Sequence, residues 1–465
     1  MQPAENLLLG GRSGQKTGKM SNTVVNAADE IKTLMNLVWF RNDLRTLDNT
    51  SLQQACTNDS GVIAVYCFDP RHFEIGPFGF KKTERFRAQF LIETIQELRE
   101  DLRKLNITLL VYLEKPEDVI PKLAAKYKVS QIYYQKEWTA EEVNVQQNVK
   151  QVCEASVTFT ANYDQFLIHP EDLPYDSFEA IPNVFTQWRK TCEKSLHIRK
   201  CVEPQQQPKT NMIDEPTDTP SLNDLGLEDF KTDNRTAFPF KGGAQQASQR
   251  IQQYFWESKK LQMYKKTRNG LVGTDYSSKL SAWLANGSIS ARIIYWEIKN
   301  FEREEVKNDS TYWLFFELMW RDFFKYISLK YGDSIFKIGG ILNKDYDWYS
   351  NKAAQKEWIS GTTKYDFVNA NMKEIAATGW MSNRGRQNVA SFWAKELQQD
   401  WRIGAAYFES MLIDYDVHSN YGNWMYNSGV GNDPRDRKFN IQSQAERYDS
   451  SGKYQRLWLE PSLFD

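Results

Sequence analysis

Short apolar runs alternate with segments of helical periodicity in the first third of the chain, and this alternation constrains the fold most strongly. The runs lie at residues 37–40, 62–66, 107–113 and 131–134, and they are typical of buried strands in a parallel sheet. Between the second and third runs, apolar residues recur at helical spacing: Phe86, Phe90, Leu91, Ile95, Leu98 and Leu102. We therefore predict an α/β domain with a doubly wound parallel sheet over residues 34–165.

The second half of the chain has a different pattern. Strand patterns are hard to find after residue 241, whereas residues 244–261, 289–305, 312–329 and 388–397 have helical periodicity. The stretch before them, residues 203–240, has linker composition, with five prolines among Asp, Thr and Gln. We predict an interdomain linker over residues 166–240 and an all-helical domain over residues 241–465.

Composition excludes several classes of protein. The charges nearly cancel, with 59 basic and 60 acidic residues, so any affinity for nucleic acid requires a local basic patch. The five cysteines are an odd number without CxxC spacing, which argues against a disulfide framework and against a zinc site. No apolar run approaches the roughly 18 residues of a membrane span. We expect a protein of a reducing compartment, without a structural metal and without a membrane anchor.

The polar N-terminal residues 1–33 are predicted to form a flexible arm instead of a signal peptide. A transit peptide is the alternative, because this arm contains few acidic residues. Met20 and Met35 are alternative natural starts.

Residues 273–281 form a hydroxyl-rich segment that leads into an apolar helix start. Small hydroxylated residues with free backbone amides suit a diphosphate at a helix N-terminus. An ordinary helix N-cap is the alternative interpretation.

Two further segments combine polar side chains with aromatic ones. In residues 383–388, Asn383, Arg386 and Gln387 share one face if a helix begins there, which indicates either a lined cavity or a solvated helix start. Residues 414–424 contain acids, amides and a tryptophan, the mixture that surrounds an isoalloxazine ring. The histidine of this segment, His418, is assigned no role. The 15 tryptophans are concentrated after residue 250, and core packing is the alternative explanation for each of them.

These segments resemble the DASH cryptochromes, a branch of the photolyase and cryptochrome superfamily. The matching blocks follow one another in order: residues 39–45, 276–284, 316–323, 378–391 and 414–424. The chain departs from the family pattern at Ala282 and Ala291, where relatives commonly have proline, at Ser278, where they often have threonine, and at residues 363–369.

The resemblance implies FAD inside the helical domain. By motif position, its phosphates would contact Tyr264, Ser277, Ser278, Lys279, Leu280 and Ser281. The flavin would be surrounded by Asn383, Arg386, Asp414 and Asp416, with Arg386 and Asp414 as a buried ion pair and Asn420 opposite flavin N5. Glu137 corresponds to the acid that contacts a folate antenna, which implies 5,10-methenyltetrahydrofolate between the domains.

The resemblance also implies an electron-transfer chain and a DNA surface. Trp424, Trp401 and Trp348 match the family's electron relay. Glu317 and Trp320 match the stretch that faces the DNA lesion, while Arg268, Gln387 and Tyr426 match positions that contact DNA. For Glu317 the alternative is an ordinary salt bridge with Arg321, four residues further along a helix.

The function that follows from the resemblance is enzymatic. We expect a deoxyribodipyrimidine photolyase, a carbon-carbon lyase that uses blue light and reduced FAD to split cyclobutane pyrimidine dimers, preferring single-stranded or looped DNA. The alternative is a blue-light photoreceptor that binds nucleic acid or a protein partner without repair. We expect a monomer located in the cytoplasm of a bacterium, or in an organelle or the nucleus of a eukaryote.

Overall fold

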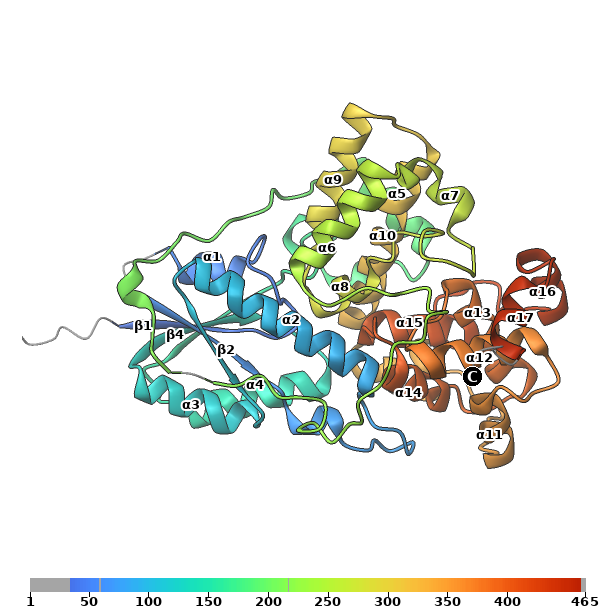
Figure 1. The fold of residues 1–465 in the computed structure, drawn as a ribbon, viewed down its shortest axis with the longest axis horizontal. Coiled ribbons are helices and arrows are strands. Elements are labelled where there is room, and N and C mark those ends of the chain that lie inside the picture. Colours follow the sequence, from blue (N-terminus) through green and yellow to red (C-terminus); the bar gives the residue numbers. More distant parts are fainter. Residues whose placement is uncertain (1–33, 58–59, 216, 461–465) are drawn as a thin grey trace, which may run out of the picture. The chain divides into compact units, whose positions relative to one another are not determined.

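The computed structural model describes residues 34–57, 60–215 and 217–460, so the predicted N-terminal arm lies outside the described residues. Five parallel strands form one sheet in the order β3-β2-β1-β4-β5 (Figure 1). Their bounds are β1 (Met35–Trp39), β2 (Gly61–Cys67), β3 (Thr108–Tyr112), β4 (Val129–Gln135) and β5 (Thr158–Asn162). The four predicted strands are confirmed. We missed β5, whose residues are only partly buried at the sheet edge and carry little apolar signal.

Helices cover both faces of this sheet. One face packs against α1 (Thr50–Ala55) and α2 (Arg85–Lys104), the helix predicted from its apolar spacing. The other face packs against α3 (Pro116–Lys126) and α4 (Ala140–Val152). The strand order reverses between β1 and β4, where the carboxyl ends of neighbouring strands leave a crevice suited to ligands.

The rest of the chain is rich in helices and, among the described residues, contains no further strand beyond an isolated bridge between Tyr349 and Gln399. The α-helices are α5 (Phe185–Lys194), α6 (Ala244–Ile251), α7 (Tyr264–Thr267), α8 (Ser281–Asn286), α9 (Ala291–Glu304), α10 (Asp309–Tyr331), α11 (Lys352–Ser360), α12 (Asp366–Thr378), α13 (Asn383–Ser391), α14 (Trp401–Met411), α15 (Val417–Ser428), α16 (Ile441–Tyr448) and α17 (Lys453–Leu459). The predicted fold class, a parallel sheet followed by a helical region, is confirmed.

Single π-helical turns extend two of these helices, at Gln252–Glu257 after α6 and at Phe392–Glu396 after α13. With these turns, the helical residues cover most of the predicted segments 244–261 and 388–397. Short 3₁₀ turns lie at Pro70–Phe73, Pro170–Asp172, Phe178–Ala180, Lys209–Asn211, Lys260–Met263, Gly332–Phe336 and Gly340–Leu342. None of the helices in the described part of the chain is long and apolar enough to cross a membrane.

The predicted linker is packed against the sheet region in spite of its polar composition. The Asn211 side chain accepts a hydrogen bond from Val62 N at 2.7 Å and donates one to Val62 O at 2.9 Å. Three leucines of the segment, Leu222, Leu225 and Leu227, are buried in the core that contains α1 and α2. A few buried side chains are therefore enough to hold a segment whose overall composition is typical of a free linker.

A buried ion network joins the loop after β1 to the helical region. Arg292 of α9 bonds Asp48 at 2.9 Å and Asp164 at 3.1 Å, and all three side chains are at most 4% exposed. Arg45 donates to the backbone oxygens of Asp48, Asp164 and Gly287. Gly287 has φ 74°, and a Cβ there would lie 2.0 Å from Asn42 O. Glycine therefore permits the close contact that this network requires.

Candidate functional site

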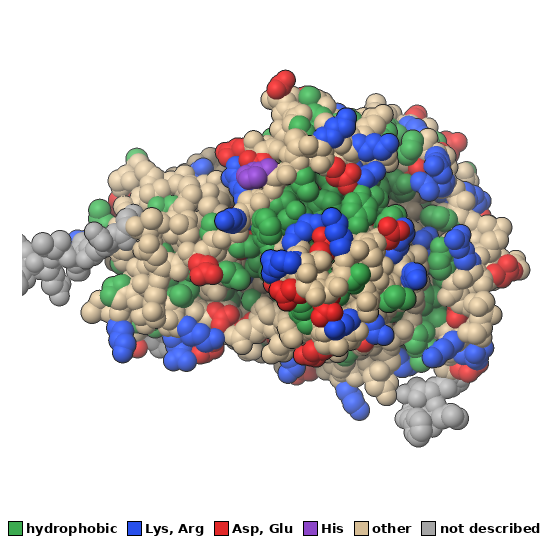
Figure 2. All heavy atoms as spheres, turned by 90° about the horizontal axis from the view of Figure 1, so that it is seen from above, with side chains coloured by type: hydrophobic (Ala, Val, Ile, Leu, Met, Phe, Trp, Pro, Cys, Tyr) green, Lys and Arg blue, Asp and Glu red, His purple; other side chains and the backbone are tan. Residues whose placement is uncertain are grey.

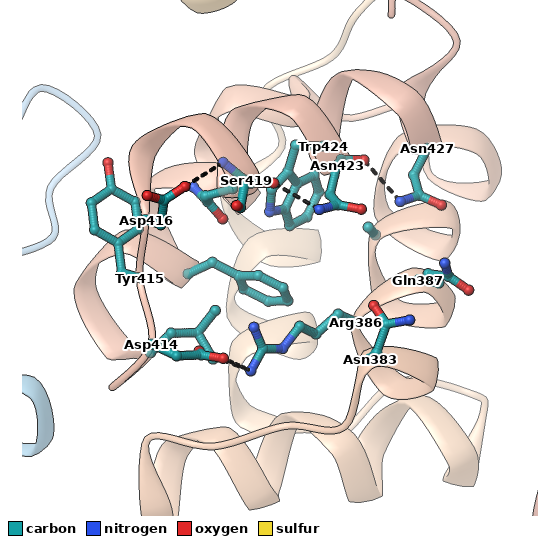
Figure 3. Close-up of a pocket in the computed structure, with 14 residues that line it drawn as sticks. Asn383, Arg386, Gln387, Asp414, Tyr415, Asp416, Ser419, Asn423, Trp424 and Asn427 are labelled. Atoms are coloured by element: carbon teal, nitrogen blue, oxygen red, sulfur yellow. Dashed lines mark hydrogen bonds and ion pairs between the residues drawn. The ribbon is translucent and has the colours of Figure 1, made fainter. Parts of the chain in front are cut away.

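One wall of a cavity in the helical region is formed by the start of α13. The helix begins at Asn383 because the Ser382 hydroxyl accepts a hydrogen bond from Gly385 N at 3.0 Å. Asn383, Arg386 and Gln387 then share one face, and all three line the cavity (Figure 3). The shared face predicted from their spacing is confirmed.

The opposite wall is formed by residues 414–416 and by α15. Arg386 reaches across the cavity and bonds both carboxylate oxygens of Asp414, at 2.9 and 3.0 Å (Figure 3). The predicted ion pair is therefore present. Its two members differ in burial, because the Asp414 side chain is 3% exposed and the Arg386 side chain 23%.

Asp416 is held by two partners. One carboxylate oxygen caps α15 by accepting from Ser419 N at 2.8 Å, and the other accepts from Lys325 Nζ at 2.8 Å. Burial alone would raise the pKa of Asp416, but the surrounding cationic groups and hydrogen bonds, those of Lys325 first among them, together hold that pKa well below its ordinary value. Asp416 therefore stays a carboxylate in the cavity wall.

Three amide side chains of α15 line the cavity. The amide nitrogens of Asn423 and Asn427 donate to the backbone oxygens of Ser419 and Asn423, each at 2.8 Å, and that of Asn420 donates to Ala405 O at 3.0 Å. Each nitrogen is thus used within the protein, and each carboxamide oxygen remains to accept from a ligand. Asn420 and Asn423 belong to the predicted segment 414–424, but we missed Asn427, whose spacing of four residues from Asn423 was the available signal.

The remaining lining is apolar. Phe408, Leu412 and Ala390 line the cavity, together with the ring of Trp424. Trp424 is 2% exposed and packs against α14, where a Cβ at Gly404 would lie 2.2 Å from its ring. The cavity therefore combines apolar surface for a flat ring with polar groups for the edge of that ring.

The predicted phosphate loop, residues 277–281, does not line this cavity directly. The ring of Trp380 is close to both the loop and the cavity. Its centroid lies 4.8 Å from Lys279 Nζ and 5.4 Å from the guanidinium carbon of Arg386. The helix that follows, α8, has only six residues, and its N-cap Leu280 makes no side-chain capping bond. The ordinary N-cap alternative is therefore wrong. The phosphate contacts of this loop stay a prediction, and Lys279 is the one charged side chain of residues 277–281.

Two residues predicted to face DNA, Glu317 and Arg268, lie together, and Tyr264, which we predicted at the FAD phosphates, lies with them. Arg268 forms a close ion pair with Glu317, and both side chains are partly exposed. Burial raises the pKa of Glu317, and Arg268 opposes that rise. The alternative salt bridge with Arg321 is wrong, because Arg321 instead donates to the backbone oxygens of Gln165 and Leu284. Tyr264 is buried and interacts electrostatically with Glu317 and Arg268, not with the phosphate loop.

Two predicted DNA contacts are neighbours. The ring of Trp320 stacks on Phe185 with centroids 3.7 Å apart, and it meets the Tyr426 ring edge-on at 6.1 Å. The carboxamide oxygen of Gln387 accepts from Arg384 at 2.9 Å, which leaves its nitrogen as a donor.

Figure 2 shows hydrophobic side chains gathered in a hollow on one face, with basic and acidic side chains mixed around them. No single sign of charge dominates that face.

Glu137 lies in a second cavity, of about 800 Å³, at the carboxyl ends of β1 and β4. It accepts from Gln135 at 2.8 Å, and burial raises its pKa while Arg41 and Lys325 oppose the rise. Tyr415 and Asp416 line both cavities. The wall between the two cavities is therefore one residue thick at these positions.

The three predicted relay tryptophans differ in how far their side chains are exposed to solvent. Trp401 is fully buried and donates to Ile338 O at 2.8 Å, whereas Trp348 is partly exposed. Trp358, which we did not predict, has its ring 6.2 Å from that of Trp424. Of the three, only Trp348 is partly exposed, so it is the one that could exchange electrons with solvent.

Comparisons with known proteins agree with this architecture. Residues 36–209 match the family model of DNA photolyase, and residues 313–463 match that of the FAD binding domain of DNA photolyase. Cryptochrome DASH of Gloeobacter violaceus is 47% identical over 426 residues, covering 91% of this chain and 85% of that protein. The chain belongs to the cryptochrome DASH family. A crystal structure of the Synechocystis cryptochrome is 47% identical, has a TM-score of 0.87, and is matched over 92% of this chain and 88% of that chain.

Other cryptochrome DASH relatives and photolyases extend the comparison. The cryptochrome DASH of Arabidopsis thaliana, named chloroplastic/mitochondrial, is 42% identical over 432 residues, covering 92% of this chain and 75% of that protein. An archaeal photolyase from Sulfolobus tokodaii, solved with two FAD molecules, is 26% identical with a TM-score of 0.73 over 92% of this chain and 90% of that chain.

The residues of the first cavity fit FAD, as the family's FAD-binding domain requires. Carboxylate, guanidinium and amide groups suit the pyrimidine edge of the flavin, and Phe408, Leu412 and Trp424 suit its ring system. Lys279, which is buried and has no hydrogen-bond partner for its Nζ, suits the diphosphate. The cofactor would thus extend from the cavity past Trp380 toward the loop of residues 277–281.

Replacing Arg386 with Ala should weaken FAD binding about ten- to hundred-fold, because Asp414 loses two charge-assisted hydrogen bonds and its only guanidinium partner. The measurement is FAD affinity by fluorescence titration. Arg402→Ala is the matched control, since Arg402 makes a similar pair with Asp400 outside the cavity, and its side chain is 30% exposed against 23% for Arg386. Equal FAD affinity in the two variants would contradict the role of Arg386.

Proposed function

We propose that this chain is a blue-light-driven DNA repair enzyme that splits cyclobutane pyrimidine dimers in single-stranded or looped DNA. The observation that supports the proposal is the close ion pair of Glu317 with Arg268, two partly exposed side chains that match the family's DNA-facing positions. Bound FAD, once reduced and excited by light, supplies the electron that opens the dimer. A dimer must leave the base stack to reach such a site, and extrusion costs least where no base pairing is lost.

In this proposal the side chains around the cavity hold and polarise the dimer. Trp320 is fixed by its stack on Phe185 and forms a corner with Tyr426, so the two rings provide apolar walls. Gln387 offers an amide donor to a pyrimidine oxygen because its own oxygen is used by Arg384. Glu317 contacts the dimer and stabilises the charge that develops on it, and Arg268 orients Glu317 and approaches the neighbouring phosphate.

Asn420 has a separate role in the proposal. Its nitrogen is used by Ala405 O, so its oxygen is the atom that faces the flavin position. A fixed acceptor there would stabilise a protonated ring nitrogen of the reduced cofactor. Asp416, held as a carboxylate by Lys325, fixes the start of α15 and thereby the position of Asn420.

Glu317→Gln tests the repair proposal. The substitution keeps the shape and one acceptor but removes the charge, so FAD content should hold while the number of dimers split per absorbed photon falls several-fold. We would measure dimer splitting in single-stranded oligonucleotides under limiting blue light, with the flavin reduced beforehand.

The matched control for this assay is Glu302→Gln, which removes a carboxylate from α9, away from the cavity. An unchanged yield in Glu317→Gln would reduce Glu317 to a structural partner of Arg268. No splitting by the wild-type chain would favour the alternative function, a blue-light photoreceptor without repair.

We also propose that Trp424, Trp401 and Trp348 carry electrons from the surface to the cavity. Trp424→Phe roughly keeps the ring volume but removes the first relay, so FAD should stay bound while photoreduction by an external thiol slows at least tenfold. Absorbance at constant illumination measures the rate. Trp393→Phe is the control, because Trp393 is also fully buried but lies one ring further away, against Trp358. Equal rates in wild type and Trp424→Phe would exclude this route.

The second cavity is proposed to hold 5,10-methenyltetrahydrofolate as an antenna. Glu137 supplies a buried acceptor for the amino group of the pterin, in a cavity large enough for a cofactor. Glu137→Gln should lower folate occupancy several-fold without changing FAD content, as read from the near-ultraviolet antenna band. Glu141→Gln is the control, since Glu141 lines the same cavity but its side chain is 68% exposed. Unchanged occupancy in Glu137→Gln would assign Glu137 another role.

A further inference from the structure

The partly exposed face of α10 carries a stripe of large aromatic side chains. Tyr312, Trp313, Phe316 and Trp320 form this aromatic stripe, and each of the four is only partly buried. Their spacing of one, three and four residues places them along one side of the helix. Aromatic side chains of this size usually fill a core, so four of them on a face that solvent reaches indicate a binding surface.

Contacts between rings hold the aromatic stripe in place. Trp313 stacks on Phe316 with the ring centroids 4.7 Å apart. Phe316 meets the ring of Phe185 from α5 edge-on at 5.2 Å, and Phe185 stacks on Trp320 at 3.7 Å. The rings are therefore in continuous contact from Trp313 to Trp320, the tryptophan predicted to face the DNA lesion.

Two basic side chains lie over the Trp313 end of the aromatic stripe. Lys265 Nζ is 4.7 Å from the centroid of the Trp313 ring, and the guanidinium carbon of Arg268 is 5.5 Å from it. Both come from α7 and its C-terminal end, and α7 packs against α10 (Figure 1). Lys265 also bonds Asp309 at 2.9 Å, but the two side chains are 41% and 85% exposed, so water screens this pair. Lys265 is therefore held weakly enough to leave the ring for a phosphate group.

A paired acid marks the end of this surface. The Tyr312 hydroxyl donates to Glu193 at 2.6 Å, and Arg189 donates to both Glu193 and the Tyr312 oxygen at 2.7 Å. Because Arg189 and Glu193 already neutralise each other, this end offers little to a phosphate. The surface suited to nucleic acid thus ends at Trp313. That residue lies four positions before Glu317, about 6 Å further along the helix axis.

We propose that Trp313 and Phe316 bind the unpaired base that neighbours the pyrimidine dimer in single-stranded DNA. The inference rests on the proposed repair function and names a further part of its substrate surface. The base stacks on the face of Trp313 that Lys265 covers, while Lys265 and Arg268 contact the neighbouring phosphates. Every base has a π-face, so this subsite carries no sequence preference.

Such a subsite gives a physical reason for a preference for single strands. In a duplex the base beside the dimer is paired, and moving it onto Trp313 costs that pairing. In a single strand no pairing is lost, so the stack on Trp313 adds to the affinity. The aromatic stripe should therefore strengthen the binding of single strands and leave the binding of duplexes unchanged.

Trp313→Leu tests the inference in the dark, where no repair takes place. The full chain with its cofactor is titrated with an oligonucleotide that carries one pyrimidine dimer, either single-stranded or annealed to its complement. The affinity for the single strand should fall about five-fold or more, which corresponds to the loss of one stacked base. The affinity for the duplex should not change.

A fluorescent base reports whether the neighbouring base stacks. The analogue 2-aminopurine, placed beside the dimer, loses fluorescence when it stacks on an aromatic ring. We expect quenching by the wild-type chain on one side of the dimer and recovery of the fluorescence in Trp313→Leu. Trp313→Phe keeps a ring and should retain part of the quenching, which separates loss of stacking from loss of folding.

Trp296→Leu is the matched control. Trp296 is also partly buried, but it lies on α9 and donates to the backbone oxygen of Arg199 at 3.1 Å. This control should bind and quench like the wild type. Equal affinity and equal quenching in Trp313→Leu and the wild type would overturn the inference. A chain that shows the Trp313 effect but splits no dimer in light would contradict the repair proposal alone.

Lys265→Ala tests the phosphate contact separately. Loss of one phosphate contact should reduce the slope of log affinity against log salt concentration by about 0.7 for a single strand. Lys126→Ala is the control, because Lys126 also pairs with an acid, Glu215, and is 55% exposed, but it belongs to α3. The same slope in Lys265→Ala as in the wild type would exclude a phosphate at Lys265.

Discussion

The buried network of Arg292, Asp48 and Asp164 is the interaction on which the arrangement of sheet and helices depends. Two carboxylates from the sheet region meet one guanidinium from α9, and Arg45 donates to the backbone oxygens of both acidic residues. Removing one member of such a network leaves a charge buried without a partner, which costs about 3–5 kcal/mol. The network therefore tolerates little displacement, and it fixes the crevice at the carboxyl ends of β1 and β4 against the helices.

This constraint explains why two cavities can share a wall. The second cavity lies where the sheet ends, and the flavin cavity lies behind residues 414–416. Lys325 connects them, because it bonds Asp416 and acts electrostatically on Glu137. Changes of charge in one cavity therefore reach the other through a lysine that is almost fully buried. The shared wall at Tyr415 and Asp416 thus brings the two cavities to within one residue of each other.

Local features of the site were predictable from sequence, whereas contacts between distant segments were not. The shared face of Asn383, Arg386 and Gln387 follows from helical spacing, and four of the five strands follow from short apolar runs. The partner of Glu317 did not follow, because spacing favoured Arg321 and the fold supplies Arg268 from 49 residues away. The packing of the linker could not be predicted either, because three leucines among many polar residues change the composition of the segment very little.

The buried charged residues of the described site fall into two groups. They differ in whether each charge has an oppositely charged side chain in direct contact. Asp414 and Asp416 each have a cation within 2.9 Å, so they are fixed carboxylates that shape the cavity whatever it contains. Lys279 and Glu374 have no such direct bond to one another in the described contacts, and each keeps one weak or neutral partner. Fully paired charges resist change because any loss leaves an unpaired group. A buried cation with only aromatic rings beside it, such as Lys279, would instead be stabilised most by an anion that a ligand brings.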